Sequence, residues 1–110
     1  HGQLAQSTHS VDEQHYLDNS IKRLVLPTTG NVFFADFSSL STDPLTIHKI
    51  NDLTENHFDK GSIITLIFES NVLINSSNDV ALESSFNGKG SLRLLSFGDG
   101  TWKEVSRTLL

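Results

Sequence analysis

Two aromatic side chains are the residues best suited to holding a sugar. Trp102, the only tryptophan, offers a flat indole face that can stack against pyranose C–H groups. Its position directly after a glycine-rich turn also suits packing in a core, and we favour that interpretation. Tyr16, the only tyrosine, carries a hydroxyl suited to a wet interface with another chain or a ligand. Trp102 and Tyr16 are both candidate ligand-binding residues.

Polar segments between apolar runs are the second place where ligand contacts are expected. Recognition residues concentrate in loops because a sheet scaffold holds the loops in place. The candidate loops are residues 38–43, 75–79 and 87–90. Within them, the candidate ligand-binding side chains are Asn75, Asn78, Asp79 and Asn87.

Carboxylates are numerous, but their pattern does not predict catalysis. Hydrolysis of a polysaccharide needs two carboxyl groups that face one groove. Asp79 and Asp99 lie in turn-forming clusters, where aspartate bonds its own backbone. No serine matches a glycine-flanked nucleophile elbow, and residues 88–91 lack the length and the ending of a phosphate-binding loop. The sequence therefore predicts a non-enzymatic protein without catalytic residues.

The histidines do not form a metal-binding pattern within one element. None pairs with another at the spacings that bring two imidazoles to one ion. We therefore expect no metal and no cofactor. In a trimer, one histidine from each chain could still converge on the axis, and His48 is the candidate for such a site.

Composition limits the kind of partner. The chain has 110 residues, of which 36% are hydrophobic, and a formal net charge of −5. One small domain with a thin core fits these values, and such a domain often completes its core against copies of itself. The acidic balance argues against a nucleic-acid partner, and no apolar run is long enough to insert into a membrane. Cysteine is absent, which excludes disulfides.

The beginning of the chain is predicted to be a lead-in that precedes the β domain. Residues 1–25 are polar, with Leu17, Ile21 and Leu24 at helical spacing. An extended or short-helical lead-in is expected there. Residues 26–110 are expected to form the β domain.

Three segments of the β domain read as single strands. Residues 32–37 and 45–50 are rich in apolar and β-branched side chains and are bounded by turn-forming residues. Residues 62–68 form the most apolar run and are expected to be a central strand covered on both faces.

Two further segments read as hairpins. Residues 72–74 and 80–82 flank a polar cluster that favours a tight turn. Residues 92–97 and 101–107 bracket a Gly-Asp-Gly turn, whose residues accept positive φ. Short strands with little room for crossover helices predict an all-β, compact antiparallel β-sandwich or roll. A few irregular β-coils are the alternative architecture.

Two motifs give the chain a family resemblance. Residues 61–68 fit the pattern G-x-x-I/V-T-L-I/L-F, and residues 100–107 fit G-x-W-x-E-V/I-S-R. Together with the apolar positions around them, these motifs resemble a module of tailed-phage tail spikes, neck appendages and fibre-like trimeric adhesins. The resemblance covers about the last two thirds of the chain.

The resemblance implies an intertwined homotrimer at or near the end of a fibre, on a virion tail or on a bacterial cell surface. Residues 26–110 would be its tip domain. Its role would be receptor binding, with a cell-surface glycan as the partner, or trimerisation and assembly without a ligand. Phe33, Phe34 and Phe37 are the expected trimer interface, because a strand directs them to both sides of one sheet.

Overall fold

The computed structural model describes most of the chain and is all-β in that part. The described residues are 8–11, 17–18, 22–26, 30–38, 43–52 and 58–110. Their strands are β1 (Thr8–Val11), β2 (Leu17–Asp18), β3 (Arg23–Leu26), β4 (Val32–Ala35), β5 (Leu45–Ile47), β6 (Lys49–Asp52), β7 (Ile63–Ile74), β8 (Val80–Ala81), β9 (Phe86–Ser96) and β10 (Trp102–Leu109).

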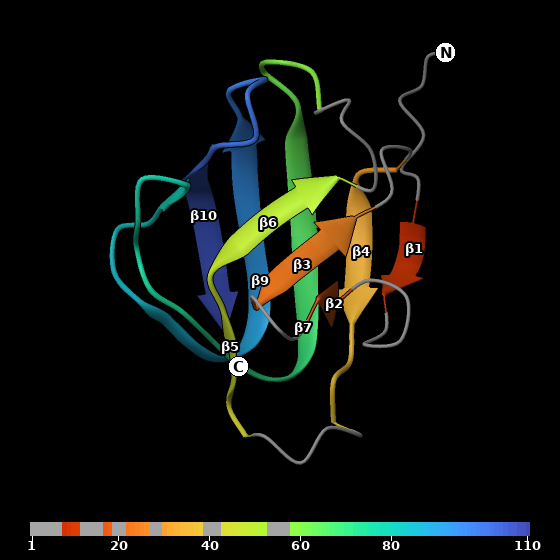
Figure 1. Ribbon diagram of the computed structural model, residues 1–110. Helices are drawn as coiled ribbons and strands as arrows, with labels where there is room; N and C mark the ends of the chain where they lie inside the picture. The colour runs from red at the N-terminus through yellow and green to blue at the C-terminus, as the bar shows by residue number, and fades with distance from the viewer. Residues whose placement is uncertain (1–7, 12–16, 19–21, 27–29, 39–42, 53–57) are drawn as a thin grey trace.

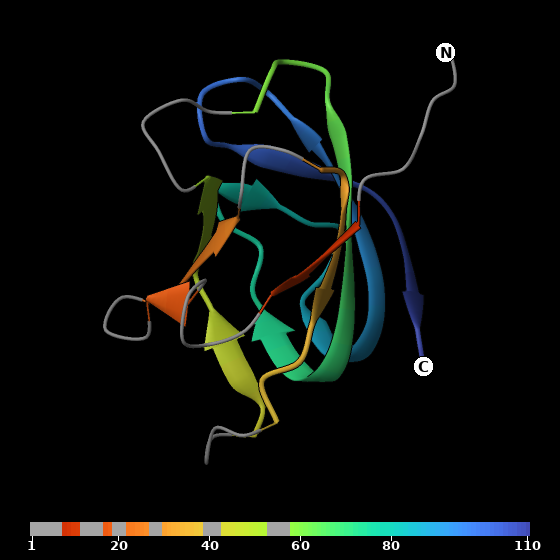
Figure 2. The same cartoon turned by 90° about the vertical axis from the view of Figure 1, so that its right-hand side faces the viewer.

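The strands form two layers, with the core between them (Figures 1 and 2). The main sheet is seven-stranded, in the order β1-β4-β7-β9-β10-β8, with β5 also paired to β7. The small sheet has the order β2-β3-β6. The compact all-β fold predicted from the sequence is therefore confirmed.

The antiparallel arrangement was wrong, because the described sheets are mixed. Strands β1, β4 and β7 lie parallel in the main sheet, and β3 and β6 lie parallel in the small sheet. Parallel strands need a long crossover. Here each crossover includes a strand of the opposite layer and, in the described residues, no helix: β3 lies between β1 and β4, β6 between β4 and β7, and β4 between β3 and β6. The expected strand over residues 45–50 is divided at His48, where the chain passes from β5 in the main sheet to β6 in the small sheet.

Strand β7 is the centre of the main sheet, as its apolar run predicts. Its inward side chains Ile64, Leu66 and Phe68 are buried. The opposite face, which was expected to be largely buried as well, is only partly covered. On that outer face Ile63 is 39% exposed, and Thr65 and Ile67 are half-buried. Only one face of this sheet is covered by the small sheet.

The hairpin around Gly98–Gly100 is confirmed. Strands β9 and β10 are antiparallel, with Trp102 opposite Ser96. The Phe97 backbone N–H donates to the Thr101 carbonyl oxygen at 3.1 Å, and Asp99 Oδ1 accepts from the Thr101 N–H at 3.0 Å. The aspartate thus stabilises its own turn.

The second expected hairpin, around residues 75–79, was wrong. Both edges of β7 are already occupied, one by β9 and the other by β4 and β5. The chain therefore crosses the sheet, and β8 pairs with β10 in parallel. Serine side chains build this wide connection: Ser77 Oγ accepts from the Val80 N–H at 3.2 Å, and Ser76 Oγ accepts from the Leu82 N–H at 2.9 Å.

The expected boundary after residue 25 falls inside a strand. Within β3, Leu24 and Leu26 are fully buried in the core, so this part of residues 1–25 belongs to the domain itself. No helix occurs among the described residues of that segment. Tyr16 lies outside the described residues.

The phenylalanines expected at the trimer interface divide between the two faces of the main sheet. Phe33 and Phe37 are buried in the chain's own core, where Phe33 contacts Phe58 edge-on with ring centroids 6.4 Å apart. The small sheet supplies the cover that a single sheet would lack, so these two rings cannot form an interface without unfolding the core. Phe34 alone keeps a partly exposed side chain.

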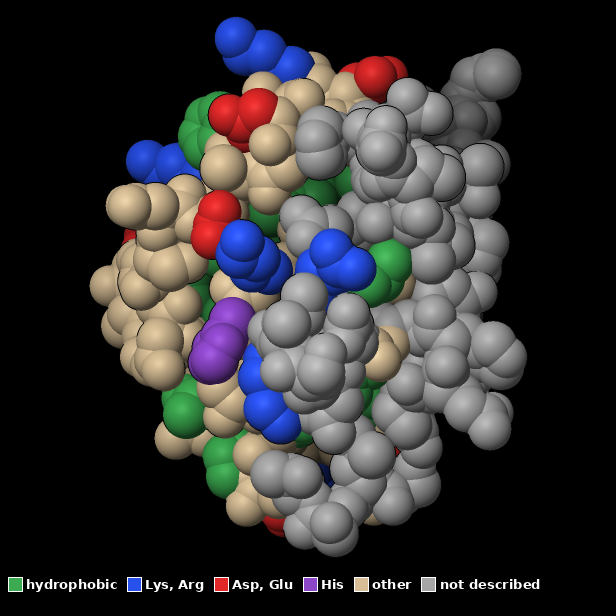
Figure 3. All heavy atoms as spheres, viewed as in Figure 1, with side chains coloured by type: hydrophobic (Ala, Val, Ile, Leu, Met, Phe, Trp, Pro, Cys, Tyr) green, Lys and Arg blue, Asp and Glu red, His purple; other side chains and the backbone are tan. Residues whose placement is uncertain are grey.

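Basic side chains gather over the small sheet (Figure 3). The described ones that belong to this sheet or adjoin it are Lys22, Arg23 and Lys49. Lys49 Nζ lies 3.9 Å from Asp79 Oδ2, with both side chains about half exposed. A pair this exposed contributes little to stability.

Candidate ligand-binding pocket

A wide bulge interrupts the central strand. Phe68 pairs with Gly90 and Val72 with Gly88, so residues 69–71 of β7 lie opposite Lys89 alone. On the other edge of β7, β4 ends opposite Phe68 and β5 begins opposite Val72. Residues 69–71 thus lack a ladder partner on both sides, and the sheet opens there. Bulges commonly re-aim side chains at functional sites.

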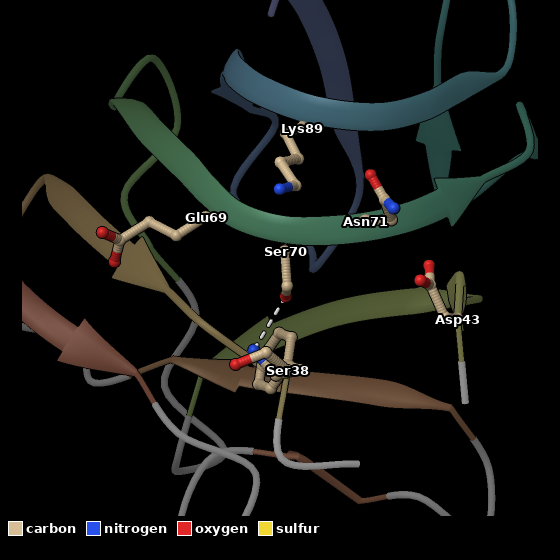
Figure 4. Close-up of a pocket in the computed structure, with 7 residues that line it drawn as sticks. Ser38, Asp43, Glu69, Ser70, Asn71 and Lys89 are labelled. Carbon is tan, nitrogen blue, oxygen red and sulfur yellow. Dashed lines mark hydrogen bonds between the residues drawn. The ribbon is translucent and has the colours of Figure 1, made fainter. Parts of the chain in front are cut away.

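A pocket of about 160 Å³ occupies this opening. We call it the bulge pocket. It is lined by Phe37, Ser38, Asp43, Glu69, Ser70, Asn71 and Lys89. Figure 4 shows Lys89 reaching from β9 toward β7, with the carboxylates of Asp43 and Glu69 on opposite sides of it. Three segments far apart in the sequence therefore bring hydrogen-bonding groups to one place.

One buried hydrogen bond fixes the floor of the bulge pocket. Ser70 is 8% exposed, and its Oγ accepts from the Phe37 N–H at 2.8 Å (Figure 4). This bond satisfies a backbone donor just beyond the end of β4, where the ladder has stopped. The serine therefore ties the loop after β4 to the bulge.

Glycines on both sides of Lys89 allow the bulge to form. Gly88 has φ +132° and Gly90 has φ +142°, which are values that other residues rarely adopt. At Gly90 a side chain would also collide with β10, since an added Cβ would lie 3.0 Å from the Leu109 Cα and closer still to the Thr108 carbonyl oxygen. The Gly-Lys-Gly sequence is the local signal for this geometry.

The positive charge of Lys89 acts on Asp36, an acidic residue beside the bulge pocket. Hydrogen bonds from Ser38 are the main reason that the pKa of Asp36 lies below its ordinary value, and the Lys89 ammonium adds a smaller effect. One of these bonds runs from the Ser38 N–H to Asp36 Oδ1 at 3.0 Å. Asp36 is thus a fixed negative charge near the pocket.

Two of the three segments expected to carry recognition contribute side chains to the bulge pocket, and residues 39–42 of the first lie outside the described residues. Ser38 and Asp43 come from the first, and Lys89 from the segment 87–90, which is part of strand β9 and not a loop. Asn87 itself pairs with Leu73 in the ladder and is exposed, but it does not line the pocket.

The remaining candidate ligand residues lie elsewhere. Asn75 and Asn78 are exposed in the connection after β7, where Asn75 Oδ1 accepts from Ser85 Oγ at 2.8 Å. Asp79 lies next to β8 and faces Lys49. Glu69, Ser70 and Asn71 were not predicted as site residues, and their polarity within an otherwise apolar strand is the only local signal for them.

Trp102 is part of the core. It is 2% exposed, and its Nε1 donates to the Ile50 carbonyl oxygen in β6 at 2.8 Å. Its ring lies edge-on to Phe58, with centroids 5.4 Å apart. The indole face is therefore not available as a sugar platform, and Trp102 joins the two layers.

Two further residues of the second motif, Glu104 and Arg107, form a clamp. Glu104 binds Arg107 through two hydrogen bonds, Nε to Oε2 at 2.7 Å and Nη2 to Oε1 at 2.6 Å. Arg107 Nη2 also donates to the Ser84 carbonyl oxygen at 2.6 Å, and Nη1 to that of Ser85 at 3.1 Å. The guanidinium lies 5.5 Å from the centroid of the Phe86 ring. This clamp holds the connection between β8 and β9 against β10.

The clamp predicts a pH dependence of stability. The hydrogen bonds from Arg107 are the main reason that the pKa of Glu104 in the folded chain lies below its ordinary value of 4.5. Its stabilising contribution is therefore present above that value and is lost as the pH falls through the folded-state pKa. We expect the free energy of unfolding, measured with denaturant, to decline between pH about 5 and pH about 3, and to decline less in Glu104→Gln.

The exposed Glu69 provides the matched control. Glu69→Gln should keep the wild-type dependence of the free energy of unfolding on pH. An equal slope in wild type and Glu104→Gln would contradict the role given to the clamp.

In the described part of the chain, no three His, Cys, Asp or Glu side chains come together as a metal site would need. His48 is exposed there. No helix among the described residues has the length and apolarity needed to cross a bilayer.

No family model, curated protein or solved structure matches this chain. The geometry of the bulge pocket and the two sequence motifs are therefore the basis for assigning a function.

Proposed function

We propose that this chain is the tip domain of a trimeric fibre or tail spike and binds a cell-surface glycan in the bulge pocket. The observation that carries the proposal is the meeting of Ser38, Asp43, Asn71 and Lys89 around one opening in the main sheet. These side chains offer both hydrogen-bond donors and acceptors, as a hydroxyl-rich ligand requires. The two fibre-module motifs supply the setting, on a virion tail or a bacterial surface fibre.

A second function, trimerisation without any ligand, is favoured by a different observation. The outer face of the main sheet carries Phe34, Ile63, Ile67 and Leu95, which are half-buried or exposed. Phe34 lies opposite Ile67, and Ile63 lies opposite Leu95. Apolar side chains left partly exposed on a sheet face are typical of a surface that a partner covers. Self-association through this face would serve either function.

Light scattering on the purified chain at micromolar concentration tests the trimer. We expect a mass of three chains, and we expect Ile63→Lys to release monomers, because a lysine on the outer face must be desolvated at the interface. Ile63 is exposed enough for the substitution to leave the single chain folded. Ala81→Lys, at an exposed position of β8, is the control and should remain trimeric.

A monomeric wild type would contradict the trimer. A glycan array on the same sample separates the two functions, because a trimer that binds no glycan is an assembly module only.

A further inference from the structure

We propose that the bulge pocket selects an uncharged sugar residue and discriminates against acidic ones. This inference rests on the proposed glycan-binding function and specifies the chemical class of the glycan. It draws on the size, the hydrogen-bonding groups and the charge of the pocket.

The size of the pocket restricts what can enter. A volume of about 160 Å³ is smaller than the roughly 300–1,000 Å³ of pockets that enclose drug-sized ligands. It suits one sugar unit of a longer glycan, with neighbouring units outside on the surface.

The polar groups around the opening match hydroxyls. A sugar hydroxyl both donates and accepts, and the pocket presents the Asn71 amide, the Asp43 carboxylate and the Lys89 ammonium. In Figure 4 Asn71 and Asp43 lie on the same side of Lys89. Neighbouring hydroxyls of one ring could therefore donate to the carboxylate and accept from the amide or the ammonium.

The charges disfavour an acidic group. The lining has two carboxylates, Asp43 and Glu69, against the single ammonium of Lys89. Asp36 adds a further negative charge close enough to Lys89 for the two to interact, and the chain as a whole carries −5. A uronic acid or another carboxylated sugar would meet net repulsion, whereas a neutral sugar would not.

Asp43→Asn separates the two ligand classes because it has opposite effects on them. The probes are neutral hexose and N-acetylhexosamine oligosaccharides in one arm and uronic-acid oligosaccharides in the other, first on an array and then by NMR titration of the full chain. The substitution removes a charged acceptor, so the best neutral ligand should bind about tenfold more weakly. It also removes repulsion, so uronic-acid oligosaccharides should bind about threefold more tightly.

Two further variants complete the experiment. Asn71→Ala should weaken the neutral ligand about tenfold or less, and chemical-shift changes in the wild type should centre on residues 69–71 and 89. Asp59→Asn changes the net charge by the same amount as Asp43→Asn, at an exposed position that does not line the pocket. It should leave the affinity for the neutral and for the uronic-acid oligosaccharides unchanged. Thermal unfolding of each variant checks that it is folded.

The outcomes distinguish the inference from the proposed function. Preferred binding of uronic-acid oligosaccharides, or shifts and variant effects that avoid the bulge pocket, would overturn the inference while leaving glycan binding intact. Failure of every oligosaccharide to bind would overturn the glycan-binding function itself.

Discussion

Gly90→Ala should lower the free energy of unfolding by about 3–5 kcal/mol, which combines overpacking against β10 with a strained backbone. The residue has φ +142°, and its missing side chain makes room for the backbone of Thr108 and Leu109. Strand β10 must shift to admit even a methyl group. Because the Leu110 N–H donates to the Lys89 carbonyl oxygen at 2.9 Å, such a shift would also disturb the bulge. Denaturant unfolding measures the loss.

Gly88→Ala is the matched control for this prediction. Its φ of +132° is similar, but an added Cβ would meet only the Leu109 side chain, at 4.0 Å. It should cost about 1–3 kcal/mol, the strain alone. Equal losses at the two glycines would show that close approach of β10 is not the cause.

Trp102→Ala should cost about 3–5 kcal/mol, as is usual when a large aromatic side chain is removed from a core. The side chain fills the space between the layers, and its hydrogen bond to Ile50 joins β10 to β6. Trp102→Phe retains much of the volume but leaves the Ile50 carbonyl oxygen without its donor. It should cost about 1–3 kcal/mol.

Calorimetry and glycan titration on the same Trp102 variants separate a packing role from a binding role. Trp102→Phe should bind glycan with unchanged affinity, because the indole is buried away from the bulge pocket. A variant with normal stability and lost affinity would restore the sugar-stacking interpretation.

The strands of the C-terminal half could be predicted from local patterns. Alternation, turn residues and the apolar run at 62–68 each depend on neighbours in the sequence, and β9 and β10 are joined by a turn whose chemistry is local. The pairing of β7 is different, because it has β4 and β5 on one edge and β9 on the other. No local pattern states which distant strand occupies an edge. The parallel pairs were therefore missed, and a hairpin around residues 75–79 was wrongly predicted.

The bulge pocket was only partly predictable for the same reason. Polar residues 69–71 appeared to separate two strands, whereas the structure carries one strand, β7, through them. Residues 38–43 and 87–90 were expected to bind ligand, but the proximity of Ser38 and Asp43 to Lys89 depends on the register of three strands. The burial of Phe33 and Phe37 likewise required knowledge of the second layer, which β3 and β6 build from segments separated by β4 and β5.

The main sheet ends in very short strands, and this has a consequence for crowded assemblies. Among the described strands its outermost members are β1, with four residues, and β8, with two. A long open strand is a template on which another protein can add its own strand, whereas a short one offers few unpaired backbone groups. Many copies held side by side on one particle would therefore have little opportunity to pair through β1 or β8, whereas residues 104–109 of β10, which β8 does not pair with, remain an edge on which another strand could add.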